Sequence, residues 1–250
     1  ILYLPNPPGV TAETQRARLD LIRGLNEERK YDTGDASIAS RVHSYELAFR
    51  MQSAAPQLLD FSKESAKTLE DYGVNKEPTH PYAVNCLLAR RMVESGVRFV
   101  MLAHSSWDHH QELNKKLKVN CDVTDRPIGA LIRDLKGRGL LDSTLLVWAG
   151  EFGRTPMGQL ERVDEDPGRD HHPNCFSIWA AGGGIQGGQV IGKTDDIGLQ
   201  VAEHPVHIHD LQATMLHCLG LEHTRLTYRQ LGRDFRLTDV GGKVVRQMLA

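Results

Sequence analysis

Three short apolar runs constrain the fold of this chain more than any other feature of its sequence. They span residues 97–103, 145–149 and 176–181, and each is followed by a polar or glycine-rich segment. Because their apolar residues are nearly continuous rather than alternating, the runs are typical of strands buried on both faces. Strands of this kind, joined by helices, form parallel sheets. The sequence therefore predicts an α/β fold with a doubly wound, mostly parallel sheet.

The N-terminal part of the chain shows helical spacing of its apolar residues instead. We expect helices at about 11–28 and 35–51. A third should begin at Pro56 and a fourth at Pro81, because proline suits the first turn of a helix.

Two further helices are expected later in the chain, at 124–135 with Thr124 as its cap, and at 209–219. The resulting organisation is a helical segment over residues 1–96, part of or a cap on the same domain, followed by an α/β core over residues 97–250.

Charge and hydropathy exclude two classes of function. The chain has 30 Lys and Arg and 32 Asp and Glu residues, so its net charge gives no electrostatic reason to expect nucleic-acid binding. Its longest apolar runs have about six residues, far short of the roughly 20 that span a bilayer. We therefore expect no nucleic-acid partner and no membrane span, and the oligomeric state stays open.

Twelve histidines are the most unusual part of the composition, and several accompany carboxylates after the predicted strands. In open parallel sheets, ligands bind at the carboxyl ends of the strands. Mixed carboxylate and imidazole ligands suit zinc, manganese or iron. The predicted metal ligands are Asp108, His110, Glu151 and His171, with His172 as the alternative to His171. The other interpretation is that they are surface residues that only form hydrogen bonds.

Two arginines flank these clusters and are the predicted catalytic residues. The guanidinium groups of Arg154 and Arg169 suit bidentate binding of phosphate or sulfate. The alternative is that both form salt bridges, with Asp164, Glu165 or Asp166 as partners.

Two glycine motifs match nucleotide-binding patterns without the context that those patterns require. Residues 187–194 fit the P-loop pattern, and residues 182–187 fit the dinucleotide fingerprint. Both need a helix directly after the glycines, whereas Asp195 begins a predicted turn. We interpret the glycines as a tight hairpin beside the site.

The remaining histidines and the tryptophans have simpler interpretations. His207 and His209 share one face of an extended chain, which would suit metal binding, but His209 or Asp210 more simply caps the helix that follows. The tryptophans are interpreted as core residues or pocket walls: Trp107, Trp148 and Trp179.

Taken together, these motifs resemble the bacterial DUF1501 family, a set of proteins related to the alkaline phosphatase and sulfatase superfamily. The resemblance covers nearly the whole chain and is most specific in GEFGRTP (150–156) and GRDHHP (168–173). Further matching stretches are LYLPNPPG (2–9), SYELAFRMQ (44–52), LARRMVESGVRF (88–99), WDHH (107–110) and GLLDSTLL (139–146).

The superfamily resemblance implies an alkaline phosphatase-like sheet, one or two divalent metals (zinc, manganese or calcium) and hydrolysis of phosphate or sulfate esters. By position, Asp108 and His110 resemble the Asp–His pair of one metal site, and His171 resembles a later histidine ligand. Glu151 takes the place of the Asp in an Asp-His-Gly or Asp-Asn-Gly motif. Phe152 takes the place of a second ligand, which implies that one metal site is weakened or lost.

The resemblance also implies segments that precede this sequence. Relatives carry a first strand with a Gly-Gly-Pro-Ser segment, where the superfamily's first ligand and nucleophile lie, and commonly a twin-arginine export signal. We therefore expect the first strand of the fold to lie outside this chain, and the parent protein to be periplasmic or exported.

The resulting hypothesis is a metal-dependent hydrolase that acts on small-molecule or glycan esters of phosphate or sulfate. The alternative is a non-catalytic module of the same fold that binds a metal, an anion or a glycan. Ser105, Ser106 and Thr155 carry the hydroxyl groups nearest in sequence to the predicted cluster, yet none occupies the family's nucleophile position.

Overall fold

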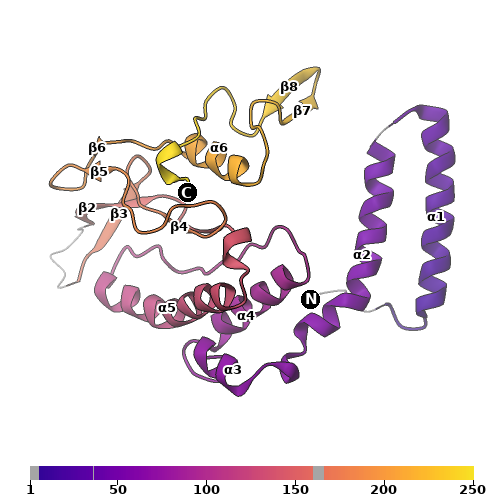
Figure 1. The fold of residues 1–250 in the computed structure, drawn as a ribbon, viewed down its shortest axis with the longest axis horizontal. Helices are drawn as coiled ribbons and strands as arrows, with labels where there is room; N and C mark the ends of the chain where they lie inside the picture. The colour runs from indigo at the N-terminus through magenta and orange to yellow at the C-terminus, as the bar shows by residue number, and fades with distance from the viewer. Residues whose placement is uncertain (1–5, 36, 160–165) are drawn as a thin grey trace. The chain divides into compact units, whose positions relative to one another are not determined.

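The computed structural model describes residues 6–35, 37–159 and 166–250. The chain divides into two compact units, an N-terminal unit, Ile1–Ser65, and a C-terminal unit, Ala66–Ala250. Among the described residues, the first five α-helices precede every strand, and α6 lies between the strands β6 and β7 (Figure 1).

The N-terminal unit is built on a pair of helices, α1 (Ala12–Thr33) and α2 (Ser37–Leu59). The two helices lie side by side (Figure 1). A salt bridge links them, with Nη2 of Arg16 2.5 Å from Oε1 of Glu46. Both predicted helices are confirmed, and each extends beyond the predicted end.

The prediction that a helix begins at Pro56 is wrong. Pro56 lies inside α2, and the chain then forms a short 3-10 helix, η1 (Phe61–Lys63), and a separate helix, α3 (Ala66–Tyr72). The backbone N–H of Ser62 donates to Oδ1 of Asp60 at 3.0 Å, which caps η1. Proline is compatible with a helix start, but the pattern alone cannot show whether the preceding turn is already helical.

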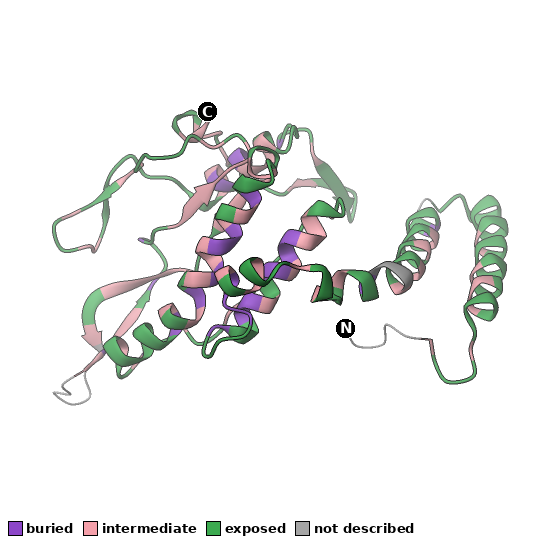
Figure 2. Ribbon diagram, turned by 60° about the horizontal axis from the view of Figure 1, so that its bottom comes forward, coloured by how far each residue is buried: buried purple, intermediate pink, exposed green. Residues whose placement is uncertain are grey.

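The core of the C-terminal unit lies between α4 (His80–Glu94) and α5 (Leu113–Gly137), and α3 packs beside them. Buried residues concentrate on these helices (Figure 2). Leu87 and Leu135 are 0% and 1% exposed. Removing apolar side chains of this size from water is the dominant favourable term in folding.

The predicted start at Pro81 is confirmed, since α4 carries this proline in its first turn. The predicted start at Thr124 is wrong, because α5 already begins at Leu113. Thr124 is buried in the middle of the helix, and its hydroxyl donates to the carbonyl of Asn120 at 2.9 Å. A threonine can satisfy its hydroxyl in this way inside a helix, so it need not be a cap.

The predicted doubly wound parallel sheet of alkaline phosphatase-like type is wrong. The described part of the chain contains two-stranded antiparallel sheets instead, and α5 does not connect parallel strands. The pairs are β1 (Leu146–Trp148) with β4 (Trp179–Ala181), β2 (Gly153–Gln159) with β3 (Gly168–His172), β5 (Lys193–Thr194) with β6 (Val201–Glu203), and β7 (Thr227–Gln230) with β8 (Arg233–Arg236).

The first apolar run, residues 97–103, shows why the prediction failed. The structure assigns it no strand, and Phe99 and Met101 are 75% and 80% exposed. Val100 and Leu102 between them are half-buried. An apolar run indicates a strand only where a neighbouring strand pairs with its backbone, and pairing is not encoded in the run itself.

The last predicted helix is confirmed as α6 (Ile208–Cys218). Its cap differs from the prediction, because the N-cap residue is His207. The His209 N–H donates to Nδ1 of His207, and the His207 N–H donates to Oδ2 of Asp210, both at 3.1 Å. This reciprocal pattern is a capping box, and it occupies Nδ1 of His207.

The glycine-rich segment forms turns rather than a nucleotide site. Gly182, Gly183 and Gly184 have positive φ and form a turn after β4. Residues 193–194 form β5, so the P-loop pattern lacks its helix, as predicted. Two short 3-10 helices, η2 (Leu141–Ser143) and η3 (Arg246–Met248), complete the described elements. None of the described helices is long and apolar enough to cross a membrane.

Candidate metal centre

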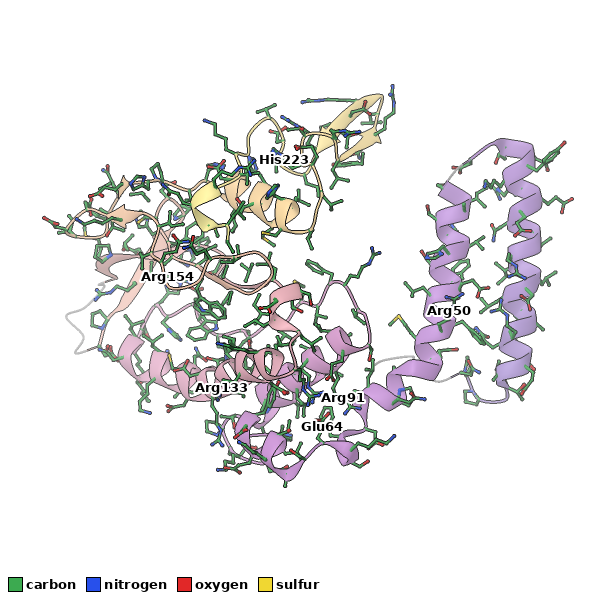
Figure 3. The ribbon with its side chains drawn as sticks, in the orientation of Figure 1. Arg50, Glu64, Arg91, Arg133, Arg154 and His223 are labelled. Atoms are coloured by element: carbon green, nitrogen blue, oxygen red, sulfur yellow. The ribbon has the colours of Figure 1, made fainter. Side chains whose placement is uncertain are left out.

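The antiparallel pair β2–β3 carries two of the predicted site residues. Its register places Arg154 directly opposite His171. Directly opposite residues of two strands point to the same face of a sheet. Figure 3 labels Arg154, which extends from this pair of strands.

The loop before α5 carries two more predicted site residues, Asp108 and His110, and this loop runs along β3. An isolated antiparallel bridge joins Gln111 to Pro167. The backbone N–H of Arg169 donates to the carbonyl of His109 at 3.1 Å, and that of Glu112 donates to Asp166 at 2.8 Å. Backbone pairing, rather than the end of a parallel strand, therefore brings residues 108–110 to His171.

Gly168 makes this close approach possible. A Cβ atom at this position would lie 2.1 Å from the carbonyl carbon of His110, which is closer than any side chain tolerates. Gly153 is under a similar constraint, since its Cβ would lie 2.1 Å from the carbonyl oxygen of Cys175. Gly153 and Gly168 are therefore needed for backbone approach rather than for a turn.

Three predicted ligands meet at one point. Nε2 of His110 lies 2.8 Å from Oδ1 of Asp108, and Nε2 of His171 lies 2.9 Å from the same oxygen. The three ligand atoms lie within 4.8 Å of one another. The side chains of Asp108, His110 and His171 are 55%, 41% and 45% exposed, so solvent reaches the cluster.

Arg154 connects this cluster to Glu151. Its Nη1 lies 2.5 Å from Oδ1 of Asp108, and its Nη2 lies 3.0 Å from Oε1 of Glu151. Glu151 is thus an arginine partner beside the cluster rather than a member of it. Phe152 lies next to both, with its ring centroid 4.6 Å from that of His171 and 5.5 Å from the guanidinium carbon of Arg154.

The surrounding groups hold Asp108 in its ionised form. Hydrogen bonding to His171, and then to Arg154, lowers the pKa of Asp108 to about 2. Interaction with the charged form is the cause, because the side chain is well solvated. The carboxylate is therefore available as an anionic ligand over the whole neutral range.

His172 and Arg169 lie outside the cluster. His172 is buried, and its Nε2 bonds to the carbonyl of Leu199 at 2.9 Å. The guanidinium group of Arg169 lies beside Gly158 of β2. Of the alternative arginine partners, Asp164 and Glu165 lie outside the described residues. Asp166 accepts hydrogen bonds from Asn114 and Lys115 at the start of α5.

Asn120 was not among the predicted site residues, yet its buried side chain forms hydrogen bonds with the loop before α5. This residue of α5 is 6% exposed. Its amide nitrogen contacts the Ser106 carbonyl at 2.5 Å and Nε2 of His109 at 3.1 Å, and its amide oxygen lies 3.1 Å from Nε2 of His104. The signal was a polar residue on the apolar face of an amphipathic helix, which is costly unless it is hydrogen-bonded.

The comparison with protein families decides where the chain belongs. The model described as "Protein of unknown function (DUF1501)" matches residues 1–249. The chain is a member of the DUF1501 family. No curated protein and no solved structure matches it. The predicted family is thus confirmed for this DUF1501 chain, while its relation to the alkaline phosphatase superfamily stays a hypothesis.

Proposed function

We propose that this DUF1501 chain binds a divalent metal ion through Asp108, His110 and His171 and hydrolyses a phosphate or sulfate ester beside it. The observation that carries the proposal is the convergence of three ligand atoms, from two distant chain segments, next to Arg154. Because a fold does not determine an activity, the argument rests on this site and not on the architecture.

The donor set fits a zinc-like ion. One carboxylate and two imidazoles are common zinc ligands, and three protein ligands leave a fourth position open, as in catalytic zinc sites. Bonds of about 2.0–2.1 Å in a tetrahedron separate ligand atoms by roughly 3.3 Å. The spacings of 2.8 and 2.9 Å around Asp108 Oδ1 need only small side-chain rotations to reach that value.

Arg154 is the residue suited to the transferred group. Its guanidinium group lies at the cluster and forms charge-assisted bonds with two carboxylates. A phosphate or sulfate oxygen can replace one of these partners and accept a charge-assisted hydrogen bond from the guanidinium nitrogen that is released. As negative charge grows on the transferred group, a preplaced guanidinium stabilises it.

The residues at the cluster favour attack by water. Thr155 donates its hydroxyl to the carbonyl of Met157 at 3.4 Å, so it is directed along its own strand. Because its pKa is lowered to about 2, Asp108 stays ionised and is available as a metal ligand rather than as a proton acceptor. A bound divalent ion would supply Lewis acidity and lower the pKa of water.

A non-catalytic binding module is the second candidate. The observation that favours it is exposure, since each of the three side chains is at least 41% accessible. Active sites that exclude water gain strength for every electrostatic interaction inside them, and this site does not exclude water by itself.

Zinc titration by calorimetry tests the proposal. We expect the metal-depleted protein to bind one Zn²⁺, and Asp108→Asn or His171→Ala to weaken binding by about 100-fold or more, because each removes one ligand of a tetrahedral set. Glu151→Gln is the matched control, and we expect it to change the affinity by less than about threefold, since Glu151 contacts Arg154 rather than the ligand atoms.

Hydrolysis of 4-nitrophenyl phosphate and 4-nitrophenyl sulfate separates the two candidates. Zinc-dependent turnover that is lost in Asp108→Asn supports the hydrolase. Zinc binding without turnover supports the binding module. If Asp108→Asn and His171→Ala bind zinc as tightly as the unmodified protein, the metal centre itself is refuted.

A further inference from the structure

The three tryptophans of this chain all lie in one row. The ring centroids of Trp107 and Trp148 are 6.3 Å apart with planes at 88°, and those of Trp148 and Trp179 are 6.3 Å apart with planes at 4°. Trp148 and Trp179 are direct partners in the β1–β4 register, which places both indoles on one face of that pair.

The row is not part of the buried core. Trp148 is 37% exposed, and Trp107 and Trp179 are half-buried. Large aromatic rings are usually buried wherever a core can take them, and contiguous exposed aromatic surface marks binding sites. The tryptophans are therefore not fully buried core residues, and part of their aromatic surface is accessible, while the alternative prediction that they form the walls of a pocket stays a prediction.

One end of the row is anchored inside the protein. The ring of Trp107 contacts His104 with centroids 5.8 Å apart, and His104 contacts the buried Tyr82 at 5.4 Å. Asn120 also holds His104 by a hydrogen bond. These contacts fix the indole before a ligand arrives, so binding loses little side-chain entropy.

The row also adjoins the candidate metal centre. Trp107 directly precedes Asp108, and its carbonyl accepts a hydrogen bond from His109 at 3.0 Å. The backbone at this end of the row therefore leads directly into a candidate metal ligand, Asp108, and Arg154 forms a salt bridge with that ligand.

We propose that the tryptophan row binds the sugar rings of a carbohydrate whose phosphate or sulfate group faces the metal centre, an inference that rests on the proposed function for its anionic group. The C–H face of a pyranose ring is apolar and carries partial positive charge, which suits the negative face of an indole. Trp148 is the most exposed of the three indoles, so its face is the main stacking surface, while Trp107 stands at 88° to it and Trp179 lies parallel to it. A metal ion held by the candidate centre would supply the charge complement for the ester group, together with Arg154 once the ester displaces one of its two carboxylate partners.

Intrinsic fluorescence gives a direct test, because all indole emission of this chain comes from the row. The probes are a chondroitin 4-sulfate hexasaccharide and the same hexasaccharide without sulfate. We expect both to change the emission and the sulfated one to bind more tightly. The expected loss of affinity in Trp148→Ala or Trp179→Ala is about tenfold or more, comparable to the loss of one aromatic stacking partner in other systems.

Two variants separate stacking from folding. Trp148→Phe keeps an aromatic face, so we expect affinity within about threefold of the unmodified protein. Tyr228→Ala removes an aromatic side chain that is 53% exposed on β7, away from the row, and we expect it to have no effect. Indole N–H resonances of the unmodified protein provide a measurement that needs no variant, and shifts in Trp148 and Trp179 are expected on titration.

Failure of this inference differs from failure of the metal centre. The desulfated hexasaccharide should bind equally well with EDTA present and in Asp108→Asn, because stacking needs no metal. If this binding persists while zinc titration fails, the row stands and the metal centre does not. Unshifted indole resonances at saturating hexasaccharide, or full affinity in folded Trp148→Ala and Trp179→Ala, would overturn the carbohydrate site.

Discussion

Nε2 of His171 lies 2.9 Å from Oδ1 of Asp108, although 63 positions of sequence separate the two residues. The contact exists because the loop before α5 pairs with the backbone of β3, next to Gly168. The geometry of the cluster thus depends on backbone spacing as much as on the ligands themselves.

A side chain at Gly168 should open the site without unfolding the protein. In Gly168→Ala the new methyl group would meet the His110 carbonyl carbon at 2.1 Å, so the loop must move away from β3. We expect zinc affinity to fall by about tenfold or more, as for loss of the groups that orient metal ligands. Calorimetry measures the change.

The matched control for Gly168 is Gly158→Ala on β2, whose Cβ would make contacts of 3.6 Å and longer. This variant should bind zinc normally. Equal affinity in both alanine variants would show that the close approach of the loop does not control the cluster.

The titration of Asp108 should depend on His171. In the folded protein its pKa is about 2, below the ordinary value of 3.8, and hydrogen bonding to His171 is the largest cause. In His171→Ala we therefore expect the pKa of Asp108 to rise toward its ordinary value. The ¹³C shift of the carboxyl group, followed from neutral to acid pH, reports it directly.

The same shift fixes the sign of one contribution to stability. Because the folded pKa lies below the unfolded one, the contribution of Asp108 is present above about pH 4 and is lost as the pH falls toward about 2. His171→Ala should flatten this part of the acid unfolding profile. An unchanged carboxyl titration in the variant would contradict the assigned cause.

Arg154 should matter for turnover but not for metal binding. Arg154→Gln removes the charge expected to stabilise the transferred group, so we expect kcat to fall by about 10² to 10³ if the protein is a hydrolase. Zinc affinity should stay equal or rise, since the guanidinium no longer competes for Asp108 Oδ1. Steady-state kinetics with 4-nitrophenyl esters and zinc calorimetry give the two readouts. A fall in zinc affinity parallel to kcat would assign Arg154 to holding the ligands instead.

The helical core should tolerate truncation least. Leu135→Ala empties a position on α5 that is 1% exposed, and we expect the free energy of unfolding to fall by about 2–5 kcal/mol. Leu117→Ala, on the same helix but 40% exposed, is the control and should cost less than about 0.5 kcal/mol. Urea unfolding followed by circular dichroism measures both. If Leu135→Ala and Leu117→Ala lowered the free energy of unfolding equally, Leu135 would not be part of the core.

Local features of the sequence predicted local structure well. The spacing of apolar residues located most of the helices, including α4 with Pro81 in its first turn. The pattern failed at Pro56 and Thr124, which lie inside helices. A proline or threonine is compatible with a helix start, but whether the helix begins there depends on the turn before it.

The partners of each segment were decided only by the tertiary structure. The runs at 145–149 and 176–181 do contain β1 and β4, yet they pair antiparallel, and residues 97–103 pair with no described strand. Apolar residues indicate that a strand is buried, but they do not show which strand pairs with it or whether that pairing is parallel or antiparallel.

The candidate site divides in the same way. The chemical types are readable from the amino acids alone, since WDHH, GEFGR and GRDHH contain carboxylate, imidazole and guanidinium groups. Only the tertiary structure separated Asp108, His110 and His171, which meet, from Glu151 and His172, which do not. The physical reason is that a ligand set is fixed by distances of a few ångströms between side chains, and the register of β3 with the loop, set by backbone hydrogen bonds and by a glycine with no Cβ, decides those distances.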